Sequence, residues 1–314
     1  MSNTAIAASG LRKAYGDKIV LGGIDLDVRA GTVFSLLGPN GAGKTTTVNV
    51  LTTLLKADGG TARVAGHDVA TDTKAVRAAI GVTGQFAAVD ELLTGQENLQ
   101  LMADLKHVGA REGQRVITEL LERFDLTESA QKLVSTYSGG MRRKLDLAMT
   151  LVGNPRIIFL DEPTTGLDPR SRRTMWDIVR GLVADGVTIF LTTQYLDEAD
   201  QLADRIAVLN HGRLVAQGTP SELKRQVPGS HVRLRFTDVF ELDAAARVLP
   251  GATRDDEDLT LRVPGDGGVK SLRALLGQLD EHSIDADELS VHTPDLDDVF
   301  LALTGRANTE VNAQ

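Results

Sequence analysis

Short apolar runs alternate with stretches of helical periodicity from residue 4 to about residue 225. Residues 32–37, 156–163 and 187–194 predict buried strands, because each is a brief apolar run bounded by polar residues or glycine. Residues 45–55 predict a helix directly after the first of these strands. Between residues 91 and 154 helical spacing dominates, which predicts a helical insertion. This order of elements is typical of an α/β fold.

The pattern changes near residues 226–230. Residues 231–236 and 259–263 alternate like half-buried strands, and residues 269–279 and 293–305 have helical spacing. Gly305 is expected to end the second helix. The apolar positions are Val232, Leu234, Phe236, Leu259, Leu261 and Val263 in the strands, and Val269, Leu272, Leu275, Leu276, Leu279, Leu296, Val299, Phe300 and Leu303 in the helices. We therefore expect one domain over residues 1–228, with a helical subdomain at about 91–154, and a small α+β domain over residues 229–314.

Composition narrows the function classes. The 314 residues carry a net charge of −9, which argues against a nucleic-acid partner. Cysteine is absent, which excludes disulfides and thiolate chemistry. No apolar run approaches the roughly 18–20 residues that cross a bilayer, and the N-terminus lacks the pattern of a signal peptide. If this protein works at a membrane, we expect a partner to bring it there.

The stretch LGPNGAGKTT, residues 37–46, has the pattern G-x-x-x-x-G-K-[ST] between a predicted strand and a predicted helix. Glycines 38, 41 and 43 let backbone N–H groups turn toward a phosphate chain, and the helix offers its positive end. Lys44 is suited to reach the terminal phosphates, and the Thr45 hydroxyl is suited to Mg²⁺. The sequence therefore predicts a nucleotide site.

Two carboxylates follow the buried run Ile157–Leu160. Asp161 is a candidate for holding Mg²⁺, and Glu162 for orienting and activating a water molecule. A carboxylate base favours hydrolysis over transfer to a second substrate. The sequence contains no N-K-x-D motif, which argues against a GTPase.

Ser138, Gly139 and Gly140 open a predicted helix and form a second candidate anion site, after the helical insertion and before the carboxylates. The basic residues 142–144 that follow are expected to form a solvated helix face. The acidic residues 295–298 are expected to start a helix, because they lack the glycine and glutamate of a calcium loop.

These motifs, in this order, resemble the nucleotide-binding subunit of an ATP-binding cassette (ABC) transporter over residues 4 to about 225. Residues 38–45 match the Walker A loop, 157–162 match Walker B, and 138–141 match the signature loop with Tyr137 and Met141 in place of the commoner leucine and glutamine. The resemblance implies ATP and Mg²⁺ as ligands and a P-loop ATPase fold. It adds further candidate contacts: Asn40 and Thr46 beside the phosphates, Tyr15 stacking on adenine, Gln85 near Mg²⁺, and Asp168 in the D-loop.

The resemblance also implies a mechanism. Two such domains associate head to tail, and each ATP lies between one Walker A loop and the partner's signature loop. With one phosphate loop per chain, a homodimer or a pair with a sister subunit is expected. The family's switch histidine is replaced by Gln194, which can donate a hydrogen bond but cannot carry a positive charge.

Four stretches resemble the daunorubicin/doxorubicin-resistance type of bacterial ABC ATPase: residues 81–95, 137–148 and 192–209, and the closing L-D-D-V-F of residues 296–300. That group implies a separate membrane-spanning subunit, docked near residues 85–107, export of hydrophobic compounds (antibiotic, drug or lipid-like), and a peripheral place on the cytoplasmic face of a bacterial cell membrane. Two alternatives remain open at this point: a soluble ABC ATPase acting on the ribosome or DNA, and a regulatory module that binds ATP without turnover.

Overall fold

The computed structural model describes residues 4–85, 87–225, 230–265, 268–292 and 294–302. The chain divides into two compact units, Met1–Pro220 and Ser221–Gln314. Helix α8 (Pro220–Lys224) spans this division, ahead of the change in composition near residue 226. Each unit has a hydrophobic core of its own.

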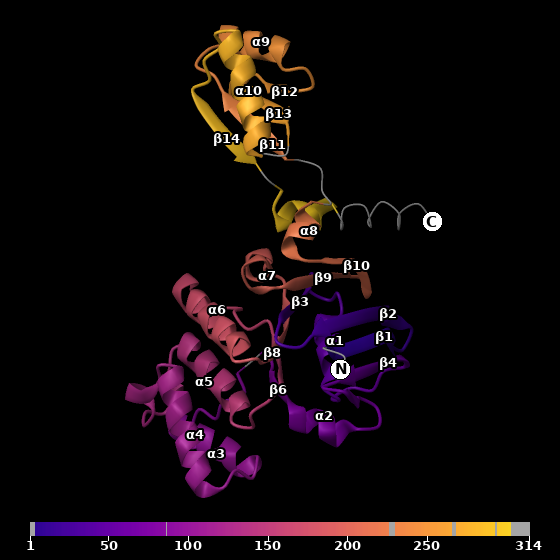
Figure 1. Cartoon of the computed structure of the whole chain (residues 1–314). Helices are drawn as coiled ribbons and strands as arrows, with labels where there is room; N and C mark the ends of the chain where they lie inside the picture. Colours follow the sequence, from indigo (N-terminus) through magenta and orange to yellow (C-terminus); the bar gives the residue numbers. More distant parts are fainter. Residues whose placement is uncertain (1–3, 86, 226–229, 266–267, 293, 303–314) are drawn as a thin grey trace. The chain divides into compact units, whose positions relative to one another are not determined.

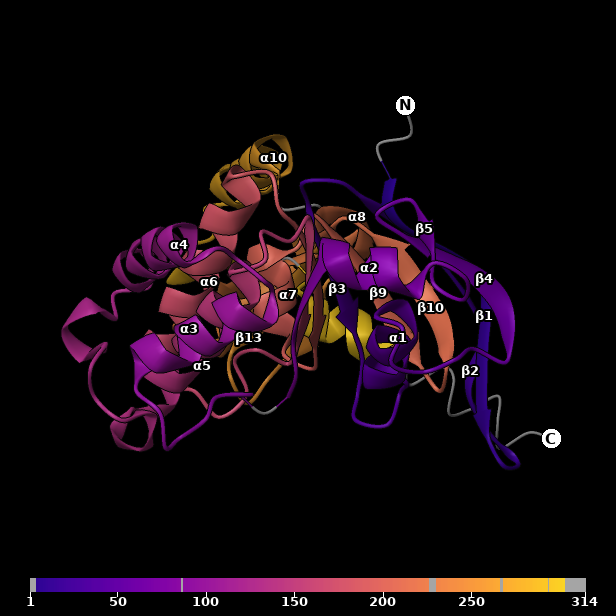
Figure 2. The same cartoon turned by 90° about the horizontal axis from the view of Figure 1, so that it is seen from below.

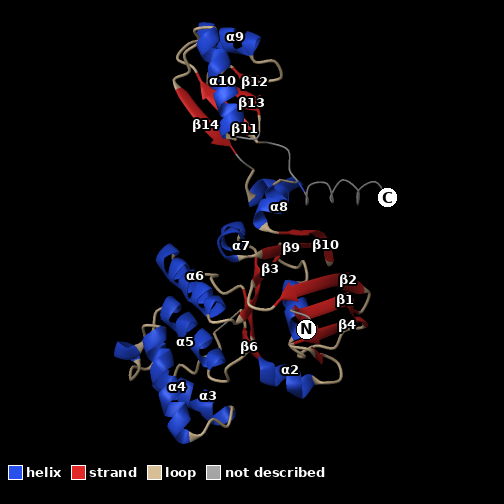
Figure 3. Cartoon of the chain, viewed as in Figure 1, coloured by secondary structure: helices blue, strands red, loops and turns tan. Residues whose placement is uncertain are grey.

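The first unit contains a six-stranded sheet in the order β10-β9-β3-β8-β7-β6 (Figures 1 and 3). Neighbouring strands from β9 to β6 run parallel, and β10 pairs antiparallel with β9. Strands β3, β7 and β8 are buried along their whole length, as expected for a parallel sheet covered on both faces. The predicted α/β class is confirmed. The strands are β3 (Val33–Leu37), β6 (Ile80–Thr83), β7 (Ile157–Asp161), β8 (Thr188–Thr193), β9 (Arg205–Asn210) and β10 (Arg213–Gly218).

A second, antiparallel sheet in the same unit has the order β2-β1-β4-β5. Buried and exposed residues alternate toward the end of β2, so one face of this sheet packs on the core. Figure 2 shows this sheet on the opposite side of the unit from helices α3, α4 and α5. Its strands are β1 (Thr4–Tyr15), β2 (Lys18–Arg29), β4 (Gly59–Val64) and β5 (His67–Asp68).

Three helices of the first unit, α3, α4 and α5, lie within residues 91–154, where helical spacing predicted a helical insertion. Helix α3 begins with a reciprocal capping box, in which the Thr94 hydroxyl accepts from the Glu97 N–H and the Glu97 carboxylate accepts from the Thr94 N–H. No helix among the described residues is long and apolar enough to cross a bilayer. The helices are α2 (Thr73–Ala79), α3 (Gly95–Leu105), α4 (Ala110–Arg123), α5 (Gly139–Leu151), α6 (Pro169–Ala184) and α7 (Leu196–Leu202), with short 3-10 turns at Thr127–Ser129 and Val134–Thr136.

Helix α1 (Lys44–Leu51) ends earlier than the sequence predicts. The expectation of a helix through residue 55 is wrong, because Thr53 adopts a left-handed φ of 65°. The N–H groups of Leu54 and Leu55 both donate to the Asn49 carbonyl (2.8 and 2.9 Å), which closes the helix end. The apolar spacing of residues 54–55 therefore does not continue the helix.

The second unit has the order strand–helix–strand–strand–helix–strand and a sheet ordered β12-β13-β11-β14. This is the arrangement of a split β-α-β (ferredoxin-like) fold. Its elements are β11 (His231–Arg235), α9 (Val239–Val248), β12 (Thr253–Asp255), β13 (Thr260–Pro264), α10 (Val269–Glu281) and β14 (Glu288–His292).

The predicted apolar positions of this unit are mostly in its core. Val232, Leu234, Phe236 and Leu261 are buried together with residues of α9 and α10. Val269 is exposed because it is the first residue of α10, and Leu276 is also exposed. Residues 296–302 are helical, and Asp295 and Asp298 exchange N–H to carboxylate bonds at their start (3.1 and 3.0 Å). The expected Leu303 and Gly305 lie outside the described residues.

Candidate functional site

The phosphate loop (residues 38–45) joins the end of β3 to the start of α1. A side chain at Gly38 would come within 2.3 Å of the Leu209 carbonyl oxygen, so only glycine fits there. Gly41 and Gly43 have left-handed φ values of 81° and 111°. These conformations form a sharp turn that leads directly into the helix. Asn40 and Thr45 are exposed, and Thr46 is half-buried in the first turn of α1.

Lys44 is buried and folds back over this loop. Its ammonium group donates to the carbonyl oxygens of Gly38 (2.8 Å) and Pro39 (3.2 Å). The same Nζ lies 3.1 Å from Oε1 of Glu162. The lysine of the phosphate loop and the candidate catalytic carboxylate are therefore in direct contact.

Asp161 and Glu162 stand at the end of β7. The Asp161 carboxylate accepts a hydrogen bond from the Thr192 hydroxyl on β8. Glu162 has a left-handed φ of 50°, a conformation that is uncommon for residues other than glycine and that clusters at functional sites. Its N–H donates to the carbonyl oxygen (3.0 Å) and the hydroxyl (3.2 Å) of Thr192. Thus the chain bends after β7 at the residue whose carboxylate contacts Lys44.

Gln194 and Gln85 follow the other two strands at this edge. Gln194 comes directly after β8 and is partly buried. The Gly38 N–H donates to the carbonyl of the preceding Thr193 (3.2 Å), so the end of β8 adjoins the phosphate loop. Gln85 lies in an exposed bend just after β6. The order β3-β8-β7-β6 lines up the phosphate loop, Gln194, the carboxylates and Gln85 along one edge of the sheet.

Ser138, Gly139 and Gly140 stand apart from this edge. Ser138 caps α5, with its hydroxyl accepting from the Met141 N–H (3.2 Å), and Gly139 is exposed. Among the described residues, no hydrogen bond or ion pair joins Ser138–Gly140 to the phosphate loop. The structure therefore does not bring the two candidate anion sites of one chain together.

Asp168 caps α6 and adjoins Gly140. Its carboxylate accepts from the Ser171 hydroxyl (2.6 Å) and from the N–H groups of Arg170 and Ser171. The Ser171 hydroxyl lowers the pKa of this exposed carboxyl, and the backbone N–H bonds act in the same direction. A side chain at Gly140 would come within 2.7 Å of the Ser171 hydroxyl oxygen. The candidate D-loop and signature loop are therefore neighbours.

Tyr15 ends β1 in the antiparallel sheet, and its side chain is 52% exposed. The Lys13 ammonium lies 5.6 Å from the centre of its ring. The exposed ring is available for stacking on a ligand.

Comparisons with known proteins identify the family. A model of the ABC transporter family matches residues 21–165. The chain is 50% identical to the daunorubicin-resistance ATP-binding protein DrrA3 of Streptomyces coeruleorubidus, over 97% of both chains. The chain belongs to the ATP-binding subunits of ABC transporters. The predicted family and ATPase activity are confirmed.

Other relatives agree with this assignment. The daunorubicin/doxorubicin-resistance ATP-binding protein DrrA of Streptomyces peucetius is 50% identical, covering 96% of this chain and 92% of its own. The Nod factor export ATP-binding protein I of Rhizobium sp. (strain N33) is 35% identical over 98% of this chain and 99% of its own. This ABC subunit is thus an ATPase that energises an export system.

Solved structures share the fold of the first unit. The ATP-binding subunit of an ABC transporter is 27% identical, with a TM-score of 0.64, and covers 71% of this chain and 92% of that structure. A dimeric ATP-binding cassette in a post-hydrolysis state with ADP and phosphate is 26% identical, with a TM-score of 0.62, over 68% and 98% of the two chains. The predicted P-loop ATPase fold is confirmed.

The prediction that residues 142–144 of this ABC subunit form a solvated face is wrong. Arg143 is buried and paired with Asp146 at 3.2 Å. Arg142 donates to the carbonyls of Val134 (3.3 Å) and Ser135 (2.9 Å). Burial lowers the pKa of Arg143 and raises that of Asp146, against the opposing pull of the pair itself. The sequence did contain a signal for this pair, because Asp146 follows Arg143 by three positions, the spacing of neighbouring side chains on a helix.

Sequence reasoning also missed Glu198, a fully buried carboxyl on α7. The indole N–H of Trp176 on α6 donates to one of its carboxylate oxygens (3.2 Å). Burial raises the pKa of this carboxyl. Glu198 therefore joins α7 to α6.

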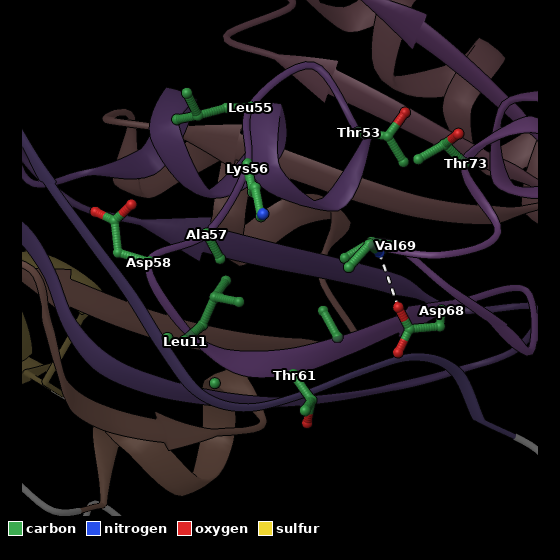
Figure 4. Close-up of a pocket in the computed structure, with 14 residues that line it drawn as sticks. Leu11, Thr53, Leu55, Lys56, Ala57, Asp58, Thr61, Asp68, Val69 and Thr73 are labelled. Atoms are coloured by element: carbon green, nitrogen blue, oxygen red, sulfur yellow. Dashed lines mark hydrogen bonds between the residues drawn. The ribbon is translucent and has the colours of Figure 1, made fainter.

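A cavity of about 460 Å³ lies elsewhere in this subunit, beside the antiparallel sheet (Figure 4). Leu11, Leu55 and Val69 contribute apolar walls, and Lys56 lines it as well. The Asp68 carboxylate is occupied within the wall by the N–H of Ala70 (2.8 Å). The cavity shares no lining residue with the edge that carries Lys44 and Glu162, so it is separate from the nucleotide site.

Proposed function

We propose that this chain hydrolyses ATP with Mg²⁺ at the edge carrying the phosphate loop, and that hydrolysis drives export of a hydrophobic compound through a separate membrane-spanning subunit. The observation that carries this proposal is the 3.1 Å contact between Lys44 Nζ and Glu162 Oε1. It puts a phosphate-binding lysine beside a carboxylate able to orient water. Recovery of a membrane-spanning protein with the ATP-bound chain tests the transport part.

The phosphate loop would hold the phosphate chain of ATP. The backbone N–H groups of Gly41, Gly43, Lys44 and Thr45, with Asn40 and Thr46 beside them, suit an anion at the positive end of α1. Lys44 adds a full positive charge for the terminal phosphates. The exposed ring of Tyr15 suits stacking on adenine.

Mg²⁺ fits the donors at this edge. The Thr45 hydroxyl, the Asp161 carboxylate and the Gln85 amide oxygen are the hard oxygen ligands that this ion prefers. The Thr45 side chain is exposed at the start of α1, which follows β3, and Asp161 ends β7, which only β8 separates from β3. When bound, Mg²⁺ neutralises charge on the phosphates.

Glu162 would act as the base that orients the attacking water, and Gln194 as a hydrogen-bond donor toward the transferred phosphate. A neutral amide at position 194 can donate without carrying a proton in the reaction. Gln194 directly follows the fully buried strand β8, which supports a fixed position for it. A carboxylate base favours hydrolysis over transfer to a second substrate.

Replacing Gln194 with alanine is expected to lower the hydrolysis rate by about 10²–10³-fold, because a positioned donor is lost in the transition state. Replacement with histidine restores a donor and should keep the rate near that of the natural chain. The measurement is steady-state phosphate release by both variants. An alanine variant that hydrolyses at the natural rate would remove Gln194 from the site.

Two copies would complete each other's sites. In the described part of the chain, no hydrogen bond or ion pair joins the signature residues Ser138–Gly140 to their own phosphate loop, and Ser171 connects Asp168 to Gly140. A second subunit presenting Ser138–Gly140 to this Lys44 would supply a second helix start for the phosphates. The related cassette solved as a dimer with ADP and phosphate supports this arrangement, and we propose a homodimer.

The membrane-spanning partner would dock on the groove beside α3. This groove, of about 270 Å³, is lined partly by Leu54, Met102 and Lys106. Leu101 and Leu105 on the same helix are 42% and 63% exposed. An apolar helix from a permease suits such a surface. The chain would then be a peripheral protein on the cytoplasmic face of a bacterial membrane.

The drug-resistance relatives support an antibiotic or lipid-like compound as the cargo. The net charge of −9 argues against nucleic acid as a partner.

We propose that residues 229–314 form an accessory domain for dimerisation or partner assembly. Deleting them is expected to leave nucleotide binding unchanged, because every proposed nucleotide residue precedes residue 200, and to weaken assembly. Nucleotide titration and light scattering of the truncated chain measure both effects. A truncated chain that is folded but does not bind nucleotide would contradict this division.

A further inference from the structure

Helix α5, which begins with the signature residues, carries a buried ion pair. Arg143 and Asp146 are only 6% and 3% exposed, and they lie 3.2 Å apart. Charged side chains are almost never this buried without a compensating set of partners. The partners of this pair come from two segments that the proposed reaction uses.

Arg143 holds the backbone on both sides of Glu162. Its Nη2 donates to the Asp161 carbonyl (3.2 Å), and its Nε donates to the Pro163 carbonyl (2.9 Å). Glu162 lies between these two carbonyls, in the left-handed conformation that turns it toward Lys44. The planar guanidinium is a rigid fork, so it fixes both carbonyls at once.

The same pair holds the backbone on both sides of Gln85. Nη1 of Arg143 donates to the Gly84 carbonyl (2.7 Å). Oδ1 of Asp146 accepts the N–H of Ala88 (3.0 Å), while Oδ2 faces the guanidinium. One ion pair thus fixes the backbone on both sides of Glu162, the proposed base, and of Gln85, the glutamine proposed to bind Mg²⁺.

We propose that Arg143 and Asp146 are positioning residues for ATP hydrolysis: they hold Glu162 and Gln85 in place relative to the signature helix. The inference rests on the roles given above to Glu162 and Gln85. In the bonds that the structure describes, neither member of the pair touches the phosphate loop, which supplies most of the proposed nucleotide contacts. Their effect falls on the catalytic step, where a displacement of about 1 Å costs about 10²-fold.

The test measures kcat and KM for ATP in the full-length chain with Mg²⁺. The double variant Arg143→Met with Asp146→Leu replaces a buried pair by apolar side chains of similar size, a change that commonly preserves stability. We expect kcat to fall by about 10–10²-fold while KM stays unchanged. Arg143→Lys keeps the charge but loses the fork, so it should also lower kcat. Lys144→Ala, whose ammonium faces Asp125 at 3.7 Å, is the matched control and should change neither constant.

A second experiment distinguishes a role of Arg143 in positioning Glu162 from a general role in stabilising the fold. In a Glu162→Gln background, Arg143→Lys should cause a smaller loss than in the natural chain, because the part of its effect that acts through Glu162 is already gone and only the part that acts through Gln85 remains. Fully additive losses in that background would overturn the inference, as would a natural kcat in folded Arg143→Lys. If Glu162→Gln alone hydrolyses ATP at the natural rate, the proposed base fails first, and that outcome is distinct from a failure of Arg143.

Discussion

Replacing Glu162 with glutamine is expected to slow phosphate release by about 10²–10⁴-fold, the usual contribution of a positioned general base. Glutamine keeps the size and a hydrogen-bond acceptor, so the strained turn after β7 can persist, but it cannot accept a proton from water. ATP binding should survive, because Lys44 also bonds to the Gly38 and Pro39 carbonyls. Phosphate release and nucleotide titration on the same preparation separate the two effects.

Glu119→Gln is the matched control for this change. Glu119 lies exposed on α4, where it pairs with Arg115 on the same helix. Its replacement should leave hydrolysis unchanged. If Glu162→Gln instead releases phosphate at the natural rate, the base has been assigned to the wrong residue. A natural chain that binds ATP without turnover would favour the regulatory module.

Replacing Lys44 with alanine is expected to weaken ATP binding by about 10–10²-fold, because a charge-assisted bond to phosphate contributes about 1.5–3 kcal/mol. The change also leaves the buried Glu162 carboxylate without its ion-pair partner. Calorimetric titration of ATP measures the affinity, and circular dichroism checks that the variant is folded. Lys74→Ala, at an exposed position of α2, should bind ATP normally. Unchanged affinity in Lys44→Ala would place the nucleotide elsewhere.

The sequence was sufficient for the strand-end chemistry because that chemistry is local. Strand, glycine turn and helix follow one another around Lys44, and a buried strand leads directly into Asp161 and Glu162. Polar residues after neighbouring parallel strands meet at one edge, so their approach follows from the fold class alone. The 3.1 Å contact between Lys44 and Glu162 is the result.

The pattern of apolar and polar residues could not predict which side chains pair with residues distant in sequence. Arg143 stands in a run of basic residues, which predicted an exposed position. Its partners are the carbonyls of Gly84, Asp161 and Pro163, which are distant in sequence and which the pattern does not reveal.

Glu198 follows the exposed Asp197, yet it is buried against Trp176. The early end of α1 depends on one left-handed residue, Thr53, which apolar spacing does not reveal.

The central claim is that ATP bound by this chain drives a membrane partner. The most direct measurement is affinity purification of the Glu162→Gln form from detergent-solubilised membranes of the native host, with and without ATP and Mg²⁺, followed by mass spectrometry with stoichiometry. We predict a protein with several membrane spans in about equal amount to this chain. Recovery of ribosomal proteins, of DNA-repair factors, or of this chain alone in both conditions would contradict the claim.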